Sequence, residues 1–333
     1  MISKMKILIV RFSSLGDVVL STPVPRLLKG KYPNSEIHFI TKKEYCSVYY
    51  NNKSVDKVIE FNKNLYKTIL NLRREKYDLV IDLHNNLRSN FLKLFLIKTH
   101  LTYNKQFFRR WIYTNFKILT SIDHISTSYV DTLSNLDITD DGKGLDFKVD
   151  EKEIIKLKNY QVDFSKCSAV VIGAKHYTKR LPEKKIIELC DKINGPIVLI
   201  GGKEEVQTAK NIEIFFNSSN ILDNDIRNKL NKKTIIYNFC GKLSIQGSAG
   251  IIKLSKNVFT HDTGFMHIAS ALNKKIFVVF GSTHHNLGFY PYQTSFSVLE
   301  NKSLHCRPCT KIGLASCPVK HFKCMNDIKF DII

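Results

Sequence analysis

Three short segments of this chain gather residues that could act on a phosphorylated substrate. A carboxylate can take the proton from a hydroxyl group, while lysine and arginine side chains can neutralise a phosphate. Residue types of both kinds recur here after short apolar runs. The segments are residues 13–17, 173–182 and 262–267, and their candidate residues are Asp17, Lys175, Lys179, Arg180, Asp262 and His267.

The third segment is the centre of a longer stretch, residues 259–272, that predicts a strand, a glycine turn and a helix N-terminus in succession. Free backbone N–H groups converge at such a point and favour an anion. Thr263 and Gly264 can offer donors to a diphosphate, and Asp262 and His267 can hold sugar hydroxyls. The alternative is an ordinary strand-to-helix turn in which His267 is a helix residue with its hydrogen bonds satisfied.

The other two segments also allow two interpretations each. Asp17 stands at the start of a helix, where a carboxylate can cap free N–H groups. As a functional alternative it is a general base, with Gly16 beside it letting a ligand approach the backbone. The basic residues of the second segment form either a solvated face or a clamp for phosphate.

Apolar runs that alternate with helical stretches predict an α/β protein with mostly parallel sheets. Strands are expected at 6–12, 36–41, 55–61 and 77–83, and again at 168–173, 197–200, 235–239, 257–260 and 275–280. Pro23 and Pro25 should make the start of the helix at 18–29 irregular. The three segments follow strands, which is where ligands bind in such sheets.

A chain of 333 residues suits two domains. The pattern predicts two Rossmann-like domains, residues 1–155 and 156–333, whose sheets face a central cleft. A donor held by one domain and an acceptor held by the other could meet there. We also expect that the last helix could pack back on the first domain.

The net charge of +21 indicates either an anionic partner or a compositional bias toward lysine. The basic stretch from Arg88 to Arg110 favours a partner, because Phe107, Phe108 and Trp111 stand among its cations. Such a surface suits a membrane or a set of phosphates. Neither a run of 18 apolar residues nor a signal-peptide core occurs, so we expect a cytoplasmic protein.

Four of the eight cysteines cluster near the C-terminal end with the spacing C-x2-C-x7-C-x6-C: Cys306, Cys309, Cys317 and Cys324. They predict either a structural metal site or reduced packing residues. The chain has no G-x-G-x-x-G after its first strand and no G-x4-G-K-[ST]. The sequence therefore does not favour an ordinary dinucleotide dehydrogenase or a P-loop NTPase.

Taken together, these motifs resemble those of glycosyltransferase family 9, the ADP-heptose:lipopolysaccharide heptosyltransferases. The matching stretches stand in the family's order at residues 7–23, 82–89, 179–182, 262–269 and 280–283. The resemblance implies a GT-B fold and inversion of the anomeric centre without an obligatory metal. Leu181 and Phe265 depart from residues common in the family, which leaves the sugar open.

Carried over residue by residue, the resemblance implies two catalytic residues, Asp17 as general base and Lys179 as the cation on the leaving diphosphate. The resemblance implies that the second domain holds the donor, with contacts from Asp262, Thr263, Gly264 and His267, and that Arg88 of the first domain faces the acceptor. From their place in the same segments, we also expect Ser14, Gly16, Lys175, Arg180 and Met266 to contact the donor. Arg109 and Arg110 of the basic stretch are further expected acceptor contacts.

The function implied is transfer of a heptose from ADP-heptose to a lipopolysaccharide inner core, or to a lipid-linked saccharide, at the cytoplasmic surface of the inner membrane. No cofactor is expected beyond the nucleotide-diphosphate sugar, and nucleic acid is not an expected partner. One alternative is a transferase of another activated sugar in cell-envelope assembly. A basic, non-catalytic nucleic-acid-binding module is the alternative from a different class.

Overall fold

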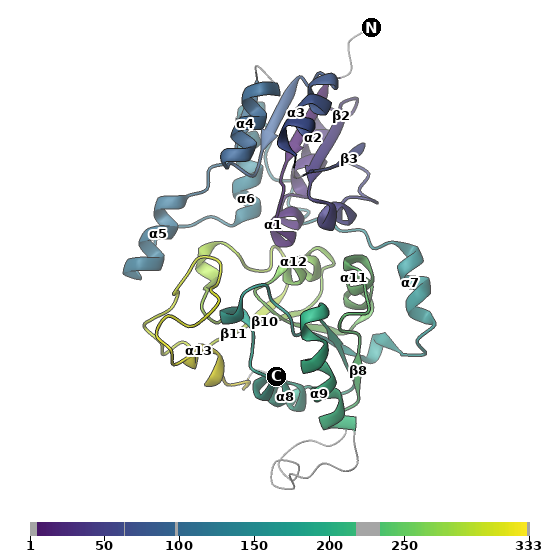
Figure 1. The fold of residues 1–333 in the computed structure, drawn as a ribbon, viewed down its shortest axis with the longest axis vertical. Coiled ribbons are helices and arrows are strands. Elements are labelled where there is room, and N and C mark those ends of the chain that lie inside the picture. Colours follow the sequence, from purple (N-terminus) through teal and green to yellow (C-terminus); the bar gives the residue numbers. More distant parts are fainter. Residues whose placement is uncertain (1–4, 63, 97–98, 218–233, 332–333) are drawn as a thin grey trace. The chain divides into compact units, whose positions relative to one another are not determined.

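The computed structural model describes residues 5–62, 64–96, 99–217 and 234–331, which group into two compact units (Figure 1). The first unit runs up to Arg109 and resumes over Ser121–Lys148. The second takes Arg110–Thr120 and the chain from Val149 onward. Residue 155, the predicted domain limit, falls inside helix α7 (Glu151–Lys158), so the division between the units precedes this helix.

The first unit is built on a five-stranded sheet in which neighbouring strands run parallel, in the order β3-β2-β1-β4-β5. The strands are β1 (Lys6–Val10), β2 (Glu36–Thr41), β3 (Lys57–Glu60), β4 (Leu79–Asp82) and β5 (His100–Thr102). The helices are α1 (Leu15–Leu20), α2 (Pro23–Lys31), η1 (Lys43–Val48), α3 (Leu65–Arg74), α4 (Leu87–Leu96), α6 (Ile125–Val130) and η2 (Asp131–Leu136), and α5 (Phe107–Phe116) crosses from this unit to the next.

The second unit holds a six-stranded parallel sheet in the order β11-β10-β9-β6-β7-β8. Its strands are β6 (Ser168–Val171), β7 (Ile197–Ile200), β8 (Ile236–Asn238), β9 (Asn257–His261), β10 (Ile276–Val279) and β11 (Phe296–Leu299). Its other helices are η3 (Phe164–Lys166), η4 (Tyr177–Lys179), α8 (Glu183–Lys192), η5 (Lys203–Glu205), α9 (Val206–Asn217), α11 (Ile245–Leu254), α12 (Gly264–Ala271), η6 (His285–Leu287) and α13 (Lys323–Asn326).

Both faces of the second sheet are buried, which explains why its strands are continuous apolar runs. Along β6, Val170 belongs to one apolar cluster and Ala169 and Val171 to another. On the first of these faces Phe259 and Phe277 stack with their ring centroids 4.5 Å apart. The prediction of two α/β halves with parallel sheets is therefore confirmed.

The helix expected at 18–29 is interrupted as its prolines predicted. α1 ends at Leu20, and the hydroxyl groups of Ser21 and Thr22 donate to the carbonyl oxygens of Val18 and Val19 at 2.8 and 2.7 Å. Pro23 then opens α2 in the first turn, where a missing N–H costs nothing.

The final helix contributes to the core of the second unit. Cys324 and Met325 of α13, with Ile328 and Phe330 beyond it, belong to an apolar cluster of the second unit. These apolar side chains are buried within their own unit, and packing of this helix on the first domain stays a prediction. None of the helices in the described ranges is long and apolar enough to cross a membrane.

Candidate functional site

In each sheet, the strand that comes first in the chain lies inside the sheet, and the chain adds later strands on both sides of it. β1 lies between β2 and β4, and β6 lies between β7 and β9. In parallel sheets such a switch point opens a crevice at the carboxyl ends of the strands, where ligands bind. Asp17 follows β1 and His84 follows β4, while Lys179 follows β6 and Asp262 follows β9. The sequence-predicted residues therefore stand at the switch points of the two sheets.

Asp17 lies in the first turn of α1 with both carboxylate oxygens engaged. Oδ2 accepts hydrogen bonds from the backbone N–H and the hydroxyl group of Ser14, at 3.0 and 2.8 Å. Oδ1 lies 2.8 Å from Nη2 of Arg11 and accepts a hydrogen bond from the Tyr129 hydroxyl at 3.2 Å. The capping interpretation of Asp17 is thus confirmed, and its role as general base stays a prediction.

Arg11 and Tyr129 fix the carboxylate of Asp17. The guanidinium of Arg11 also donates to the carbonyl oxygen of Leu83 at 2.6 Å and lies 5.5 Å from the centroid of the Tyr129 ring. Burial alone would raise the pKa of Asp17, but the charge of Arg11 and the hydrogen bonds from Ser14 outweigh it and hold that pKa below its ordinary value. Asp17 is therefore an oriented, ionised carboxylate at neutral pH.

Sequence reasoning missed both of these partners. Arg11 carried a usable signal, because it is a charged residue directly after the apolar run of β1. Tyr129 carried none, since it is 112 residues away from Asp17 and lies in the segment where the strand and helix pattern is blurred. Burial raises the pKa of Tyr129 well above its usual value, so its hydroxyl stays protonated and donates.

Asp82 organises the turn after β4. Its Oδ1 accepts the backbone N–H groups of His84 and Asn85 at 2.9 and 2.8 Å, and its Oδ2 pairs with Nζ of Lys93 at 3.0 Å. Burial, and then the charge of Arg11, lower the pKa of His84 to about 4, so this imidazole is neutral at pH 7. The same turn leads into α4, where the predicted acceptor contact Arg88 is exposed.

A second polar cluster, made of Lys179, Asp262 and Thr283, forms in the second unit. Oδ2 of Asp262 lies 2.7 Å from Nζ of Lys179 and accepts the hydroxyl hydrogen of Thr283 at 2.8 Å. Both charged side chains are largely buried but reach the surface. Three strand ends, those of β6, β9 and β10, converge on this one carboxylate. The cluster joins the predicted catalytic lysine to the predicted donor-binding aspartate.

Directly after Asp262, helix α12 begins at Gly264 with Thr263 as its N-cap. The Thr263 side chain makes no capping hydrogen bond; its hydroxyl oxygen instead lies 3.5 Å from that of Thr260. The N–H of Met266 donates to the carbonyl oxygen of Thr263 at 3.2 Å, so the first-turn N–H groups that can serve an anion are those of Gly264 and Phe265. The side chain of Met266 is wholly buried in an apolar cluster, and a donor contact of this residue stays a prediction. His267 is also buried.

The basic residues of the loop before α8 have different surroundings. Arg180 donates to the carbonyl oxygen of Ala174 and pairs with the carboxylates of Glu204 and Glu205, at 2.8 and 3.4 Å. Its charge is already neutralised by these partners, so it holds the loop in place. Lys175 is exposed, whereas Lys179 is largely buried and pairs with Asp262.

The predicted acceptor contacts Arg109 and Arg110 have unlike surroundings. Arg109 is exposed and donates to the carbonyl oxygen of Ser121 at 2.9 Å. Arg110 is only 8% exposed, and its guanidinium lies 5.7 Å from the centroid of the Phe289 ring in the second unit. Arg110 is therefore a packing residue, whereas Arg88 and Arg109 present their charges to solvent.

The clustered cysteines carry free thiols and do not form a closed metal site. In the described part of the chain, no three cysteine sulfurs lie within 4.8 Å of one another. Sγ of Cys309 donates to the carbonyl oxygen of Cys306 at 3.0 Å, and Cys324 is buried in the apolar cluster that contains α13. Burial raises the pKa of Cys309 to about 11 and that of Cys324 to about 12.

His284, His285 and Glu300 come close enough together for a metal, but their hydrogen bonding does not suit one. The backbone N–H of Asn286 donates to Nδ1 of His284 at 3.1 Å, so the neutral ring carries its proton on Nε2, the atom that faces Glu300 at 3.9 Å. Arg307 already pairs with Glu300 at 3.0 Å. The three side chains thus form a polar cluster in which the rings of His284 and His285 stack and Glu300 pairs with Arg307.

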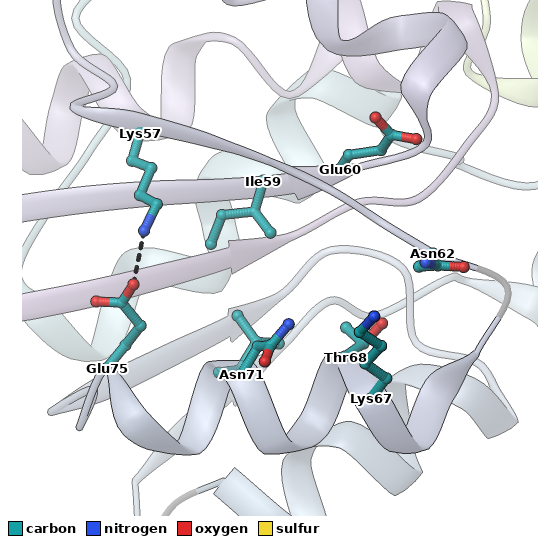
Figure 2. Close-up of a pocket in the computed structure, with 9 residues that line it drawn as sticks. Lys57, Ile59, Glu60, Asn62, Lys67, Thr68, Asn71 and Glu75 are labelled. Carbon is teal, nitrogen blue, oxygen red and sulfur yellow. Dashed lines mark hydrogen bonds and ion pairs between the residues drawn. The ribbon is translucent and has the colours of Figure 1, made fainter.

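A separate pocket of about 360 Å³ lies between β3 and α3 in the first unit (Figure 2). Lys57 and Glu75 close one side of it through an ion pair of 2.6 Å. Hydrogen bonds from Lys57 and Lys6 lower the pKa of Glu75 to about 2. None of the sequence-predicted site residues lines this pocket, so it is distinct from both polar clusters.

Comparisons with known proteins agree with this geometry. The sequence model of glycosyltransferase family 9 (heptosyltransferase) matches residues 65–319. Lipooligosaccharide heptosyltransferase 2 of Campylobacter jejuni is 26% identical over 332 residues, covering 98% of this chain and 96% of the relative. That alignment, unlike the family match, also spans the segment that contains Asp17.

Solved structures confirm the fold. The ADP-heptose lipopolysaccharide heptosyltransferase II of E. coli superposes with a TM-score of 0.69 at 19% identity, covering 97% of this chain and 98% of that one. A family 9 glycosyltransferase of Veillonella parvula gives a TM-score of 0.71 at 21% identity, covering 89% and 86%. The predicted GT-B fold class is therefore confirmed.

Proposed function

Because the chain belongs to glycosyltransferase family 9, we propose that it transfers a heptose from ADP-heptose to the inner core of a lipopolysaccharide or lipooligosaccharide. The observation that carries this proposal is the cluster of Lys179, Asp262 and Thr283 beside the N-terminus of α12. A diphosphate suits this place, because a lysine and the first-turn N–H groups of a helix both favour its charge.

On the acceptor side, Asp17 takes the proton from the attacking hydroxyl. Arg11 and Tyr129 hold the carboxylate in one orientation, so that little reorganisation is needed during the reaction. The low pKa of Asp17 makes it a weak base. It therefore accepts the proton late, when bond formation has made the hydroxyl acidic.

On the donor side, the hydroxyl oxygen attacks the anomeric carbon as the bond from that carbon to the phosphate oxygen breaks. ADP leaves and the configuration inverts. Lys179 and the N–H groups of Gly264 and Phe265 stabilise the charge that develops on the diphosphate. Asp262 orients Lys179 and offers an oxygen to a sugar hydroxyl.

The exposed arginines Arg88 and Arg109 support an anionic acceptor. A lipid-anchored acceptor of this kind would hold the enzyme at the cytoplasmic face of the inner membrane, as a peripheral protein. Neither the fold nor the relatives favour the alternatives of another activated sugar or of nucleic-acid binding.

We propose that the reaction needs no metal, since Lys179 and the helix N-terminus supply positive charge to the leaving group. The transfer rate should be the same before and after treatment with a chelator. A rate that fell with EDTA and returned with one divalent ion would contradict this part of the proposal.

The donor assignment can be tested by the thermal stability of the protein with ADP, UDP, GDP and CMP, because a nucleotide that binds the folded state stabilises it. We expect the largest rise in Tm with ADP. Lys179→Met should reduce that rise, while Lys184→Met, on the neighbouring helix α8, should leave it unchanged. A larger rise with UDP or GDP than with ADP would remove the heptose assignment.

A further inference from the structure

Helices α4 and α5 carry many exposed apolar side chains. A helix at the surface of a soluble domain normally presents its apolar stripe to the core and its polar residues outward. These two helices bury only a few side chains each and leave most of their large apolar residues exposed. Exposed apolar side chains that gather in this way mark an interaction surface.

On α4 the outward residues are spaced i, i+4, i+7 and i+8: Leu87, Phe91, Leu94 and Phe95. This spacing places them on one face, the α4 stripe. Leu87 is 80% exposed and Leu94 75% exposed. The buried face of the same helix holds Ser89 and Leu92. A conventional amphipathic helix would bury the stripe.

On α5 the outward residues are aromatic: Phe107, Phe108, Trp111 and Phe116, which we name the α5 stripe. Its buried residues are Arg110, Tyr113 and Thr114. Arg110 lies against Phe289 and the ring of Tyr113 against His284, so the polar side of the helix packs on the second unit. Ile118 and Leu119 continue the exposed apolar surface beyond the helix.

The charge of this region indicates what covers the two stripes. Residues 83–122 contain seven lysines and arginines and no aspartate or glutamate. Of these cations, Arg88, Arg109 and Lys117 are exposed within or next to the stripes. Two carboxylates, Asp123 and Asp131, lie near the start of α5, in a pocket that Phe107, Phe108 and Arg109 also line. Exposed aromatic and aliphatic side chains with a net excess of neighbouring cations match the interface of a bilayer rich in anionic lipid.

We propose that the α4 stripe and the α5 stripe each bind the surface of an anionic phospholipid bilayer, with their apolar side chains in the interfacial layer and the neighbouring cations at the lipid phosphates. This inference deepens the proposed function, on whose lipid-anchored acceptor it rests for its biological setting. The binding itself depends on the stripes and not on catalysis.

Trp111 provides a direct test, because it is the only tryptophan in the chain and lies on the α5 stripe. Vesicles of phosphatidylglycerol and phosphatidylethanolamine should shift its emission to the blue, and brominated phosphatidylglycerol should quench it. Vesicles of phosphatidylcholine alone should do neither, and added salt should weaken the effect. Unchanged emission with the anionic vesicles would overturn the proposal.

Variants can distinguish binding through the stripes from non-specific adsorption of exposed apolar side chains to vesicles. The pairs Leu94→Ser with Phe95→Ser, and Phe108→Ser with Phe116→Ser, should each weaken co-sedimentation with anionic vesicles about tenfold. The matched control is Ile155→Ser with Ile214→Ser, two exposed isoleucines of α7 and α9, which should bind as the native protein does. Equal loss in the control pair would contradict the assignment.

Two further measurements complete the test. If the stripes instead cover a second copy of the chain, sedimentation equilibrium without vesicles will show self-association that the same variants abolish, and the membrane proposal falls. Heptose transfer to a delipidated, soluble acceptor should be unchanged in the stripe variants. A protein that transfers heptose without binding vesicles would remove this inference and leave the proposed function intact.

Discussion

Replacing Asp17 by asparagine removes one charge while keeping the shape of the side chain. The amide oxygen can still accept the hydrogen bond from Ser14, so most of the cap survives. Arg11, however, loses the partner of its 2.8 Å ion pair. Breaking a fully buried pair costs about 3–5 kcal/mol, and since these side chains are 10% and 16% exposed we expect about 2–3 kcal/mol of lost stability.

Loss of the base should have a larger effect on catalysis than on folding. A general base contributes roughly 10²–10⁴ in rate, so kcat/KM for transfer from ADP-heptose should fall by about that factor in Asp17→Asn. Urea unfolding and steady-state transfer, measured on the same preparation, give the two quantities separately.

The double variant Arg11→Met with Asp17→Asn separates the two roles, because it removes the charged pair as a whole. Its free energy of unfolding should return to within about 1 kcal/mol of the native value, while its transfer rate should stay as low as that of Asp17→Asn. If the double variant regained activity together with stability, the loss in Asp17→Asn would be structural and the base assignment wrong. A native rate in Asp17→Asn would refute it directly.

Three further predictions concern the second unit. Lys179→Met should weaken ADP binding roughly 10- to 100-fold, because it removes one hydrogen bond to a charged group. Calorimetry measures the Kd for ADP, and an unchanged Kd would contradict the role of Lys179. Gly281→Ala should lower both Tm and kcat/KM, because the added Cβ would lie 2.9 Å from the carbonyl oxygen of Thr178, next to Lys179; native kinetics would show that this loop adapts freely. His261 accepts the N–H of Leu181 through Nε2, and burial lowers its pKa to about 4. Because the unfolded chain binds this proton near pH 6.5, the stability that neutral His261 contributes should be lost as pH falls from 6.5 to 4, by up to about 3 kcal/mol. His261→Gln should flatten that slope in urea titrations, and an unaltered slope would contradict the assignment.

The strands were predictable because both faces of each sheet are covered and the apolar runs are continuous. β2 and β7 have the predicted bounds. The region of residues 100–140 was not predictable, because helix α5 leaves most of its aromatic residues exposed and buries Arg110 and Thr114 together with Tyr113. β11 was missed as well, since only one of its four residues is buried.

The site was predictable where residues act from the ends of adjacent strands. Lys179 and Asp262 could be paired because their segments follow strands of one sheet, and the structure brings them to 2.7 Å. Arg180 and Met266 belong to the same two segments, but a salt bridge and an apolar core take up their side chains. The local sequence does not reveal whether a side chain will contact a ligand or other parts of the protein, because those partners come from elsewhere in the chain.

The most direct measurement of the central claim is mass spectrometry of a heptose-deficient core acceptor after incubation with the purified protein and ADP-heptose. The account predicts that the acceptor gains one heptose, with inversion at the anomeric carbon seen by NMR, and that UDP- and GDP-sugars give no product. Transfer from a UDP- or GDP-sugar, with none from ADP-heptose under the same conditions, would contradict it.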